Sequence, residues 1–209
     1  MKKIILTLAL VVATATSAFA QFGLSAGYAH NMMRSADEGD PLITDGLYAE
    51  ATYTLPIAGG LSLVPGVRYT FLGNGDFKGI DVGDISDLAS IEASISEHYI
   101  AVPLMLQYCL KFGEARLFAF AGPTLELGLA SNLNVVASVA GIGFDQDIDL
   151  FGEDGIFTRT DVAVTGGAGI QIHKFFVKAS YDFGLLNRSA VEKINYNDQQ
   201  IRVGVGFLF

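Results

Sequence analysis

The sequence contains little of what several protein classes require. Among its 209 residues there is a single cysteine, Cys109, there is no tryptophan, and only 17% of the residues are charged. A lone cysteine forms neither an intramolecular disulfide nor a cysteine-based metal centre. The 13 basic residues are outnumbered by 22 acidic ones, and this balance repels nucleic-acid phosphates. A disulfide-stapled domain and a nucleic-acid-binding protein are therefore excluded, and a hydrophobic content of 51% excludes a disordered chain.

Hydrophobic runs long enough for a membrane-spanning helix are also missing. The longest mostly apolar stretch, 117–144, contains Pro123, Glu126 and several glycines. A spanning helix needs about 20 predominantly apolar residues without such interruptions. We therefore expect no transmembrane helix, although the mean hydropathy is high, at +0.41.

The first twenty residues have the features of a secretory signal peptide. Lys2 and Lys3 precede a short apolar run, Ile4–Ala13, and the stretch Ser17–Ala20 has a small-x-small cleavage pattern. An uncleaved anchor is disfavoured because the apolar run is too short to span a membrane. We expect residues 1–20 to be removed and residues 21–209 to form one exported domain with a net charge of −11.

The remaining chain is dominated by a pattern with a period of two. Near the C-terminus, apolar residues at odd positions from Ile201 to Phe209 alternate with Gln200, Arg202 and two glycines. This period is typical of a β-strand whose two faces meet different surroundings. Eight segments show it: 22–28, 47–55, 62–71, 97–110, 116–129, 161–172, 177–185 and 200–209.

Short and long connections alternate between these segments. The short turns are 56–60, 112–114 and 173–174, and the long connections are 34–44, 73–96, 131–158 and 187–198. Outer-membrane barrels have this asymmetry, with short turns on the periplasmic side. We therefore predict an all-β fold: an eight-stranded antiparallel up-and-down transmembrane β-barrel with short periplasmic turns and long extracellular loops.

Alternation alone does not say which face points outward, because a soluble lipocalin-like barrel has the two faces reversed. The polar face is rich in glycine and also carries Cys109, for which we expect a buried free thiol. A solvated exterior normally bears more charge, whereas a narrow eight-stranded lumen needs small residues. The charges on this face sum to zero, as expected of buried groups that pair. We predict a paired network in the lumen, formed by Glu50, Arg68, Arg116, Glu126, Asp161, Lys178, Asp182 and Arg202.

The long connections carry the net charge of the mature chain. They hold −2 in 34–44, −4 in 73–96, −5 in 131–158 and zero in 187–198. Such a rim favours divalent cations that bridge to lipopolysaccharide phosphates, or a basic partner, although solvated loops without a partner are the simpler interpretation.

Three aspartates in the third long connection resemble the start of a calcium-binding loop. They are Asp145, Asp147 and Asp149, but Leu150 and Ile156 replace the glycine and glutamate that such a loop requires. We expect a weak cation site at most, and neither a dedicated metal site nor a cofactor.

Catalytic motifs are weak. The stretch Gly23–Gly27 matches G-x-S-x-G, but that motif works at a strand-to-helix turn and here lies within a predicted strand. His30 and His98 fall near the predicted outer rim, together with Ser35, Ser94 and Ser96. We interpret these as polar rim residues and predict no enzymatic activity.

Four stretches resemble the small outer-membrane β-barrel family of Bacteroides-type bacteria, whose members are described as porin-family or PorT-like. They are His98–Tyr108, Ala121–Pro123, Tyr181–Asn187 and Gln200–Phe209. The resemblance implies an outer-membrane location, an eight-stranded barrel and a C-terminal aromatic residue, here Phe209, that the barrel-assembly machinery recognises. It implies no activity and no catalytic residues, and segment 132–154 matches no family pattern.

These observations predict a non-enzymatic outer-membrane barrel with a lumen plugged by paired charges. Its acidic extracellular loops would contact outer-membrane lipid and lipopolysaccharide, or an unidentified extracellular or envelope protein, and not nucleic acid. A lipid-modifying hydrolase at the extracellular rim and a narrow pore for small solutes remain as alternatives. Ester hydrolysis and single-channel conductance distinguish them.

Overall fold

The computed structural model describes residues 21–35, 41–77, 89–139, 142–151, 157–189 and 196–209. The predicted signal peptide, 1–20, lies outside these residues. Within them, no helix has the length and apolar character needed to cross a membrane. The strands are β1 (Gln21–Ser35), β2 (Leu42–Ala58), β3 (Leu61–Phe77), β4 (Ala89–Phe112), β5 (Ala115–Val139), β6 (Ile142–Asp149), β7 (Thr160–Ile172), β8 (Phe175–Gly184) and β9 (Tyr196–Leu208).

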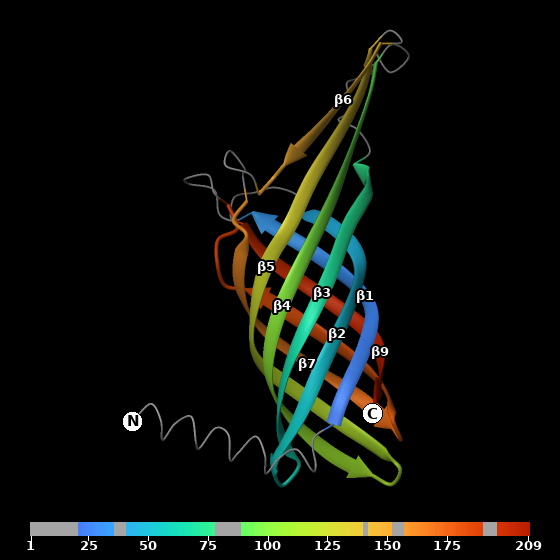
Figure 1. The fold of residues 1–209 in the computed structure, drawn as a ribbon, viewed down its shortest axis with the longest axis vertical. Coiled ribbons are helices and arrows are strands. Elements are labelled where there is room, and N and C mark those ends of the chain that lie inside the picture. The colour runs from blue at the N-terminus through green and yellow to red at the C-terminus, as the bar shows by residue number, and fades with distance from the viewer. Residues whose placement is uncertain (1–20, 36–40, 78–88, 140–141, 152–156, 190–195) are drawn as a thin grey trace, which may run out of the picture.

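Eight of these strands close into an antiparallel barrel (Figure 1). Consecutive strands pair from β1 to β5, then β5 pairs with β7, and β9 returns to pair with β1. The pair β1–β9 runs in register from Gly23 opposite Leu208 to Ser35 opposite Tyr196. The ninth strand, β6, pairs only with the outer part of β5. The predicted fold class is therefore confirmed.

Tight turns connect the strands at the end of the barrel that the sequence predicts to be periplasmic. Gly59, Gly60 and Gly113 have φ values of 57°, 89° and 61°, and His173 has 56°. This left-handed conformation matches the twist of paired strands across short hairpin loops, and it favours glycine because glycine has no Cβ to clash. The C-terminus lies at the same end (Figure 1).

The two strand faces have the predicted orientation. In β9 the side chain of Arg202 is buried, whereas its neighbours Val203 and Val205 are 49% and 62% exposed. Apolar side chains from all eight barrel strands are exposed in the same way, as a lipid-facing surface requires. Glycines on the inner face make room for aromatic rings: Phe118 lies over Gly169, and Phe176 lies over Gly206.

The strands are longer than the sequence pattern predicted. Much of the predicted connections 73–96 and 131–158 is strand, in the outer parts of β3, β4 and β5 and in β6. About 9–11 residues suffice to cross a bilayer, whereas β4 and β5 have 24 and 25 residues. β6, the outer part of β5 and the start of β4 project past the rest of the barrel (Figure 1), and strands of this length are expected to extend beyond the membrane. Backbone pairing between β4, β5 and β6 satisfies the polar groups of these segments, so they do not need to be irregular.

Candidate functional site

The middle of the lumen holds a cluster of buried charges centred on Arg68. The Arg68 side chain is 2% exposed, and its guanidinium contacts carboxylates from three other strands. The distances are 2.9 Å to Asp182 on β8, 3.7 Å to Glu50 on β2 and 3.7 Å to Glu126 on β5. Since each carboxylate comes from a different wall of the barrel, the Arg68 side chain links those walls across the lumen.

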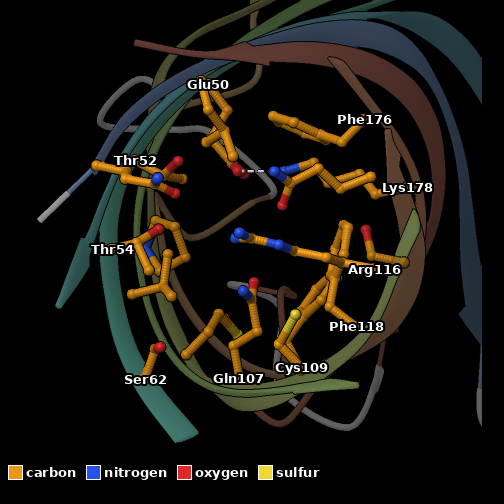
Figure 2. Close-up of a pocket in the computed structure, with 18 of the residues that line it drawn as sticks. Glu50, Thr52, Thr54, Ser62, Gln107, Cys109, Arg116, Phe118, Phe176 and Lys178 are labelled. Carbon is orange, nitrogen blue, oxygen red and sulfur yellow. Dashed lines mark hydrogen bonds and ion pairs between the residues drawn. The ribbon is translucent and has the colours of Figure 1, made fainter. Parts of the chain in front are cut away.

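Two further cations complete this central cluster. The Lys178 ammonium pairs with Glu50, as Figure 2 shows, and Arg202 pairs with the other oxygen of Asp182. The central cluster is therefore neutral, with three cations and three carboxylates: Arg68, Lys178, Arg202, Glu50, Glu126 and Asp182. Close pairing is what makes buried charges tolerable, because an unpaired one carries a large desolvation cost.

The other two predicted members of the network lie apart from the central cluster. Asp161 accepts hydrogen bonds from the backbone amides of Val162, at 2.7 Å, and Leu186, at 3.2 Å. Arg116 projects into the lumen near the periplasmic turns (Figure 2). Within the described residues neither side chain has an ion-pair partner. The expectation of one network of eight paired charges was therefore wrong for these two positions.

A second buried cluster, the outer cluster, lies toward the extracellular end. Arg188 pairs with Asp198 and donates a 2.9 Å hydrogen bond to the Tyr99 hydroxyl. That hydroxyl donates in turn to Glu97, at 2.7 Å, and Glu97 also accepts from Ser131, at 3.0 Å. Both belong to the predicted connection 187–198. Arg188 does lie between β8 and β9, whereas Asp198 lies on β9, and both side chains are buried instead of solvated.

Sequence signals for the outer cluster were faint. Glu97 and Tyr99 share the inward face at the edge of a predicted strand, but an arginine within a polar connection looks like a solvated residue. Nothing in the sequence says that Arg188 enters the lumen. Its position follows from backbone contacts with other segments, which are the hydrogen bonds from Thr158 N to Arg188 O and from Arg188 N to Tyr196 O.

Aromatic residues pack on the outer cluster. The Arg188 guanidinium lies 5.1 Å from the centre of the Tyr99 ring and 5.9 Å from that of Phe151. Tyr99 and Phe151 meet edge to face, with ring centres 6.2 Å apart. Leu150, Phe151 and Phe157 are all buried in one apolar cluster with Tyr99. Leu150 and Phe151, which directly follow β6, therefore pack over the outer cluster.

The predicted rim histidines lie on the outward face. The His30 ring is 2.6 Å from the Asp45 carboxylate, which also accepts a hydrogen bond from the Tyr28 hydroxyl. His98 is 2.6 Å from the Tyr69 hydroxyl. No serine among the described side chains forms a hydrogen bond with either histidine. The described side chains include Ser94 and Ser96 but not Ser35.

Ser25, the serine of the G-x-S-x-G match, is buried on the lumen side of a continuous strand, which is not the geometry of a nucleophile turn.

The three predicted cation-site aspartates lie on β6 and not in a loop. Asp147 accepts a 2.9 Å hydrogen bond from the Asn134 side chain, and Asp149 accepts one of 2.9 Å from the backbone of Phe151. Asp145 belongs to the same strand, where an extended backbone cannot wrap ligands around one ion as a calcium loop does. In the described part of the chain, no group of three or more His, Cys, Asp or Glu residues is arranged to hold a metal ion.

The C-terminal residue is fixed to the barrel wall. The backbone amide of Phe209 donates a 2.9 Å hydrogen bond to Phe22, and its ring centre lies 5.8 Å from that of Phe22 and 5.1 Å from that of Phe207. The Phe209 side chain is nevertheless exposed toward the lipid-facing surface.

Several solved structures of outer-membrane proteins resemble this chain. The attachment invasion locus protein Ail of Yersinia pestis is 14% identical, with a TM-score of 0.46 over 91% of this chain and 99% of that one. Neisserial surface protein A gives the same values. The outer membrane enzyme PagL is 8% identical, with a TM-score of 0.50 over 86% of this chain and 97% of that one. Likeness at such identities concerns the fold alone.

Comparison with curated proteins found no match. A family model does match, however, and it covers residues 14–189. Its description, outer membrane protein beta-barrel domain, agrees with the closed barrel and the exposed apolar surface described above. The chain is therefore a member of the family of bacterial outer-membrane proteins with this β-barrel domain.

Proposed function

We propose that this outer-membrane protein is a closed, non-enzymatic barrel whose acidic extracellular extension makes contacts at the cell surface. The central cluster supports the closed lumen, because Arg68 lies there among carboxylates from β2, β5 and β8. The packing of Phe151 against Arg188 of the outer cluster supports a second closure. Aqueous channels use about 16–18 strands, and eight leave room for little more than side chains.

Single-channel recording in planar lipid bilayers tests the closed lumen. We expect no steady conductance from the purified, folded protein, because ions would have to cross both buried clusters. Vesicles without protein serve as the control for leakage. Steady unitary openings of the wild-type protein would instead establish the narrow-pore alternative.

The second half of the proposal concerns the extension formed by β6 and its partner strands. β6 carries three aspartates and no basic residue, and the side chains of Asp147 and Asp149 are exposed. Carboxylates in such a position attract divalent cations and, through them, lipopolysaccharide phosphates, or a basic protein surface. We propose the cation-bridged lipopolysaccharide contact as the primary one.

A lipopolysaccharide binding assay in nanodiscs tests this contact. Binding should require Mg²⁺ or Ca²⁺, and it should fall in a variant that combines Asp145→Asn, Asp147→Asn and Asp149→Asn, because the bridging charges are gone. Gln146→Ser on the same strand, which leaves the charge unchanged, is the matched control. Binding that persists in the triple variant and in chelator contradicts the role of these aspartates.

One feature of the outward face bears on whether the protein is an enzyme. The His30–Asp45 pair resembles a base and its orienting carboxylate, but no described serine bonds to His30. We therefore expect no hydrolysis of a short acyl ester. Turnover that is lost in His98→Ala or His30→Ala would favour the hydrolase alternative.

We infer that the chain belongs with the PorT-like barrels of Bacteroides-type bacteria, on the four sequence stretches that resemble them. We also propose that Phe209 is the residue recognised by the barrel-assembly machinery, which its exposed terminal ring supports.

A further inference from the structure

The lumen contains a cavity of about 430 Å³ on the periplasmic side of the central cluster. Its lining runs from Glu50, Arg68 and Lys178 to residues beside the short turns, including Lys111 and Arg116. Figure 2 looks into this cavity and shows Arg116 reaching toward its middle. The volume lies in the range of about 300–1,000 Å³ that is common for small-molecule sites.

At the end of the cavity beside the short turns, two cations have no ion-pair partner among the described residues. Lys111 and Arg116 lie directly opposite each other on β4 and β5. Glu50 is the one acidic residue among the described residues that line the cavity, and it is paired with Lys178 and Arg68. Glu114, in the adjacent turn, forms no ion pair with either cation. Two like charges facing each other across a strand pair are unfavourable unless an anion lies near them.

The rest of the wall is of mixed character. Phe118, Phe176 and Met105 contribute buried apolar surface, and Gln107 and Ser62 contribute polar groups. An inorganic anion would leave the apolar part of this wall against water, and a purely apolar ligand would leave the two cations unpaired. The lining therefore matches a molecule that has an apolar body and one anionic end.

We propose that this cavity binds a small organic carboxylate with an apolar body, which enters from the periplasmic side. The Arg116 guanidinium binds the carboxylate, with Lys111 adding to the positive potential, and the apolar body lies against Phe118 and Phe176. Arginine suits this role because its planar fork pairs with both oxygens of a carboxylate. The proposal does not depend on the cell-surface contacts proposed above.

Cys109 provides a reporter inside the cavity. It is the single cysteine of the chain, it lines the cavity, and it lies opposite Phe118 in the β4–β5 pairing. Its modification can be followed with an anionic and a cationic methanethiosulfonate, each rate being normalised to the same reagent's rate with free cysteine. In phosphatidylcholine nanodiscs we expect the anionic reagent to react several-fold faster, because Lys111 and Arg116 attract it.

Protection of Cys109 by a soluble probe tests binding itself. We expect 4-phenylbutyrate to slow modification in a saturable manner and 4-phenylbutanol, which has the same body without the charge, to protect much less. Arg116→Gln should weaken protection about tenfold or more, since a hydrogen bond to a charged group contributes about 1.5–3 kcal/mol. Arg116→Lys should restore part of it.

Lys174→Gln is the matched control, because it removes a cation at the same end of the barrel whose ammonium lies over Phe207, a residue outside the cavity lining. It should leave protection unchanged. Folding of each variant is checked by heat-modifiable gel migration. Equal protection by the acid and the alcohol in the wild-type protein, or protection unaffected by Arg116→Gln, overturns the proposal. The comparison of the two probes needs no variant, so a folding failure of Arg116→Gln leaves the test intact.

Discussion

Arg68 connects three walls of the barrel through one guanidinium group. Its neighbourhood differs sharply from that of Arg116, which projects into the same lumen but has no ion-pair partner among the described residues. From the sequence the two arginines look alike, since each is an isolated cation on the inward face of a strand. What separates them is the set of carboxylates that other strands bring within reach.

Arg68→Ala should therefore destabilise the barrel much more than Arg116→Ala. Removing the cation leaves Glu50, Glu126 and Asp182 with only two counter-charges, and breaking a buried pair from one side costs about 3–5 kcal/mol. Urea unfolding in lipid vesicles, followed by circular dichroism, measures the free energy of unfolding. For Arg116→Ala we expect a change below about 1 kcal/mol, and equal losses in the two variants would contradict this account of the central cluster.

Strand β7 shows how glycine spacing shapes an element of the wall. Gly167 faces the lumen, where a Cβ would lie 2.5 Å from the Ala179 carbonyl oxygen and against the Phe120 ring. Gly166, its neighbour, faces outward, and a Cβ there would meet nothing within 4 Å. Two adjacent glycines thus have different reasons to be present, and only one of them is required by packing.

Gly167→Ala should destabilise the fold, whereas Gly166→Ala should not. The first forces Phe120 and the neighbouring backbone to shift, a type of overpacking that costs about 1–3 kcal/mol. The second reduces the freedom of the unfolded chain and should be neutral or stabilising by up to about 1 kcal/mol. The midpoint of heat-modifiable gel migration compares the two variants, and a reversed order would contradict a packing requirement for glycine at position 167.

At the scale of the whole molecule, charge is distributed along the barrel axis. The extracellular extension carries the three β6 aspartates, and the central cluster is neutral. At the periplasmic end of the lumen, Lys111 and Arg116 have no ion-pair partner among the described residues. This distribution is consistent with the two separate proposals, a cell-surface contact at one end and a carboxylate ligand in the lumen at the other.

The mature protein in the outer-membrane fraction should begin at Gln21. Cleavage after Ala20 follows from the small-x-small pattern, and strand β1 begins at Gln21. Mass spectrometry of the intact purified protein measures the mature N-terminus. Changing Ala18 and Ala20 to bulky residues should block processing, whereas Thr16→Ser should not. A mature protein that retains residues 1–20 would show that this segment is not a signal peptide.

The sequence by itself determined the strand faces, the number of barrel strands and the end at which the turns lie. Those features depend on local alternation and on the lengths of connections, which are readable along one chain. The strand ends were less well predicted, because polar residues in 73–96 and 131–158 look like loop residues although their backbones pair. Pairing depends on a partner strand that local composition does not reveal.

Only the tertiary structure decided which inward charges meet. Arg188 was assigned to an exposed connection and is buried beside Tyr99, whereas Arg116 was assigned to a paired network and faces a cavity. The physical reason is that tilted strands bring together residues far apart in sequence, so depth in the lumen depends on register and stagger around the closed barrel. The period-two pattern predicts whether a side chain points into or out of the barrel. Closure of the barrel determines which other side chains it contacts.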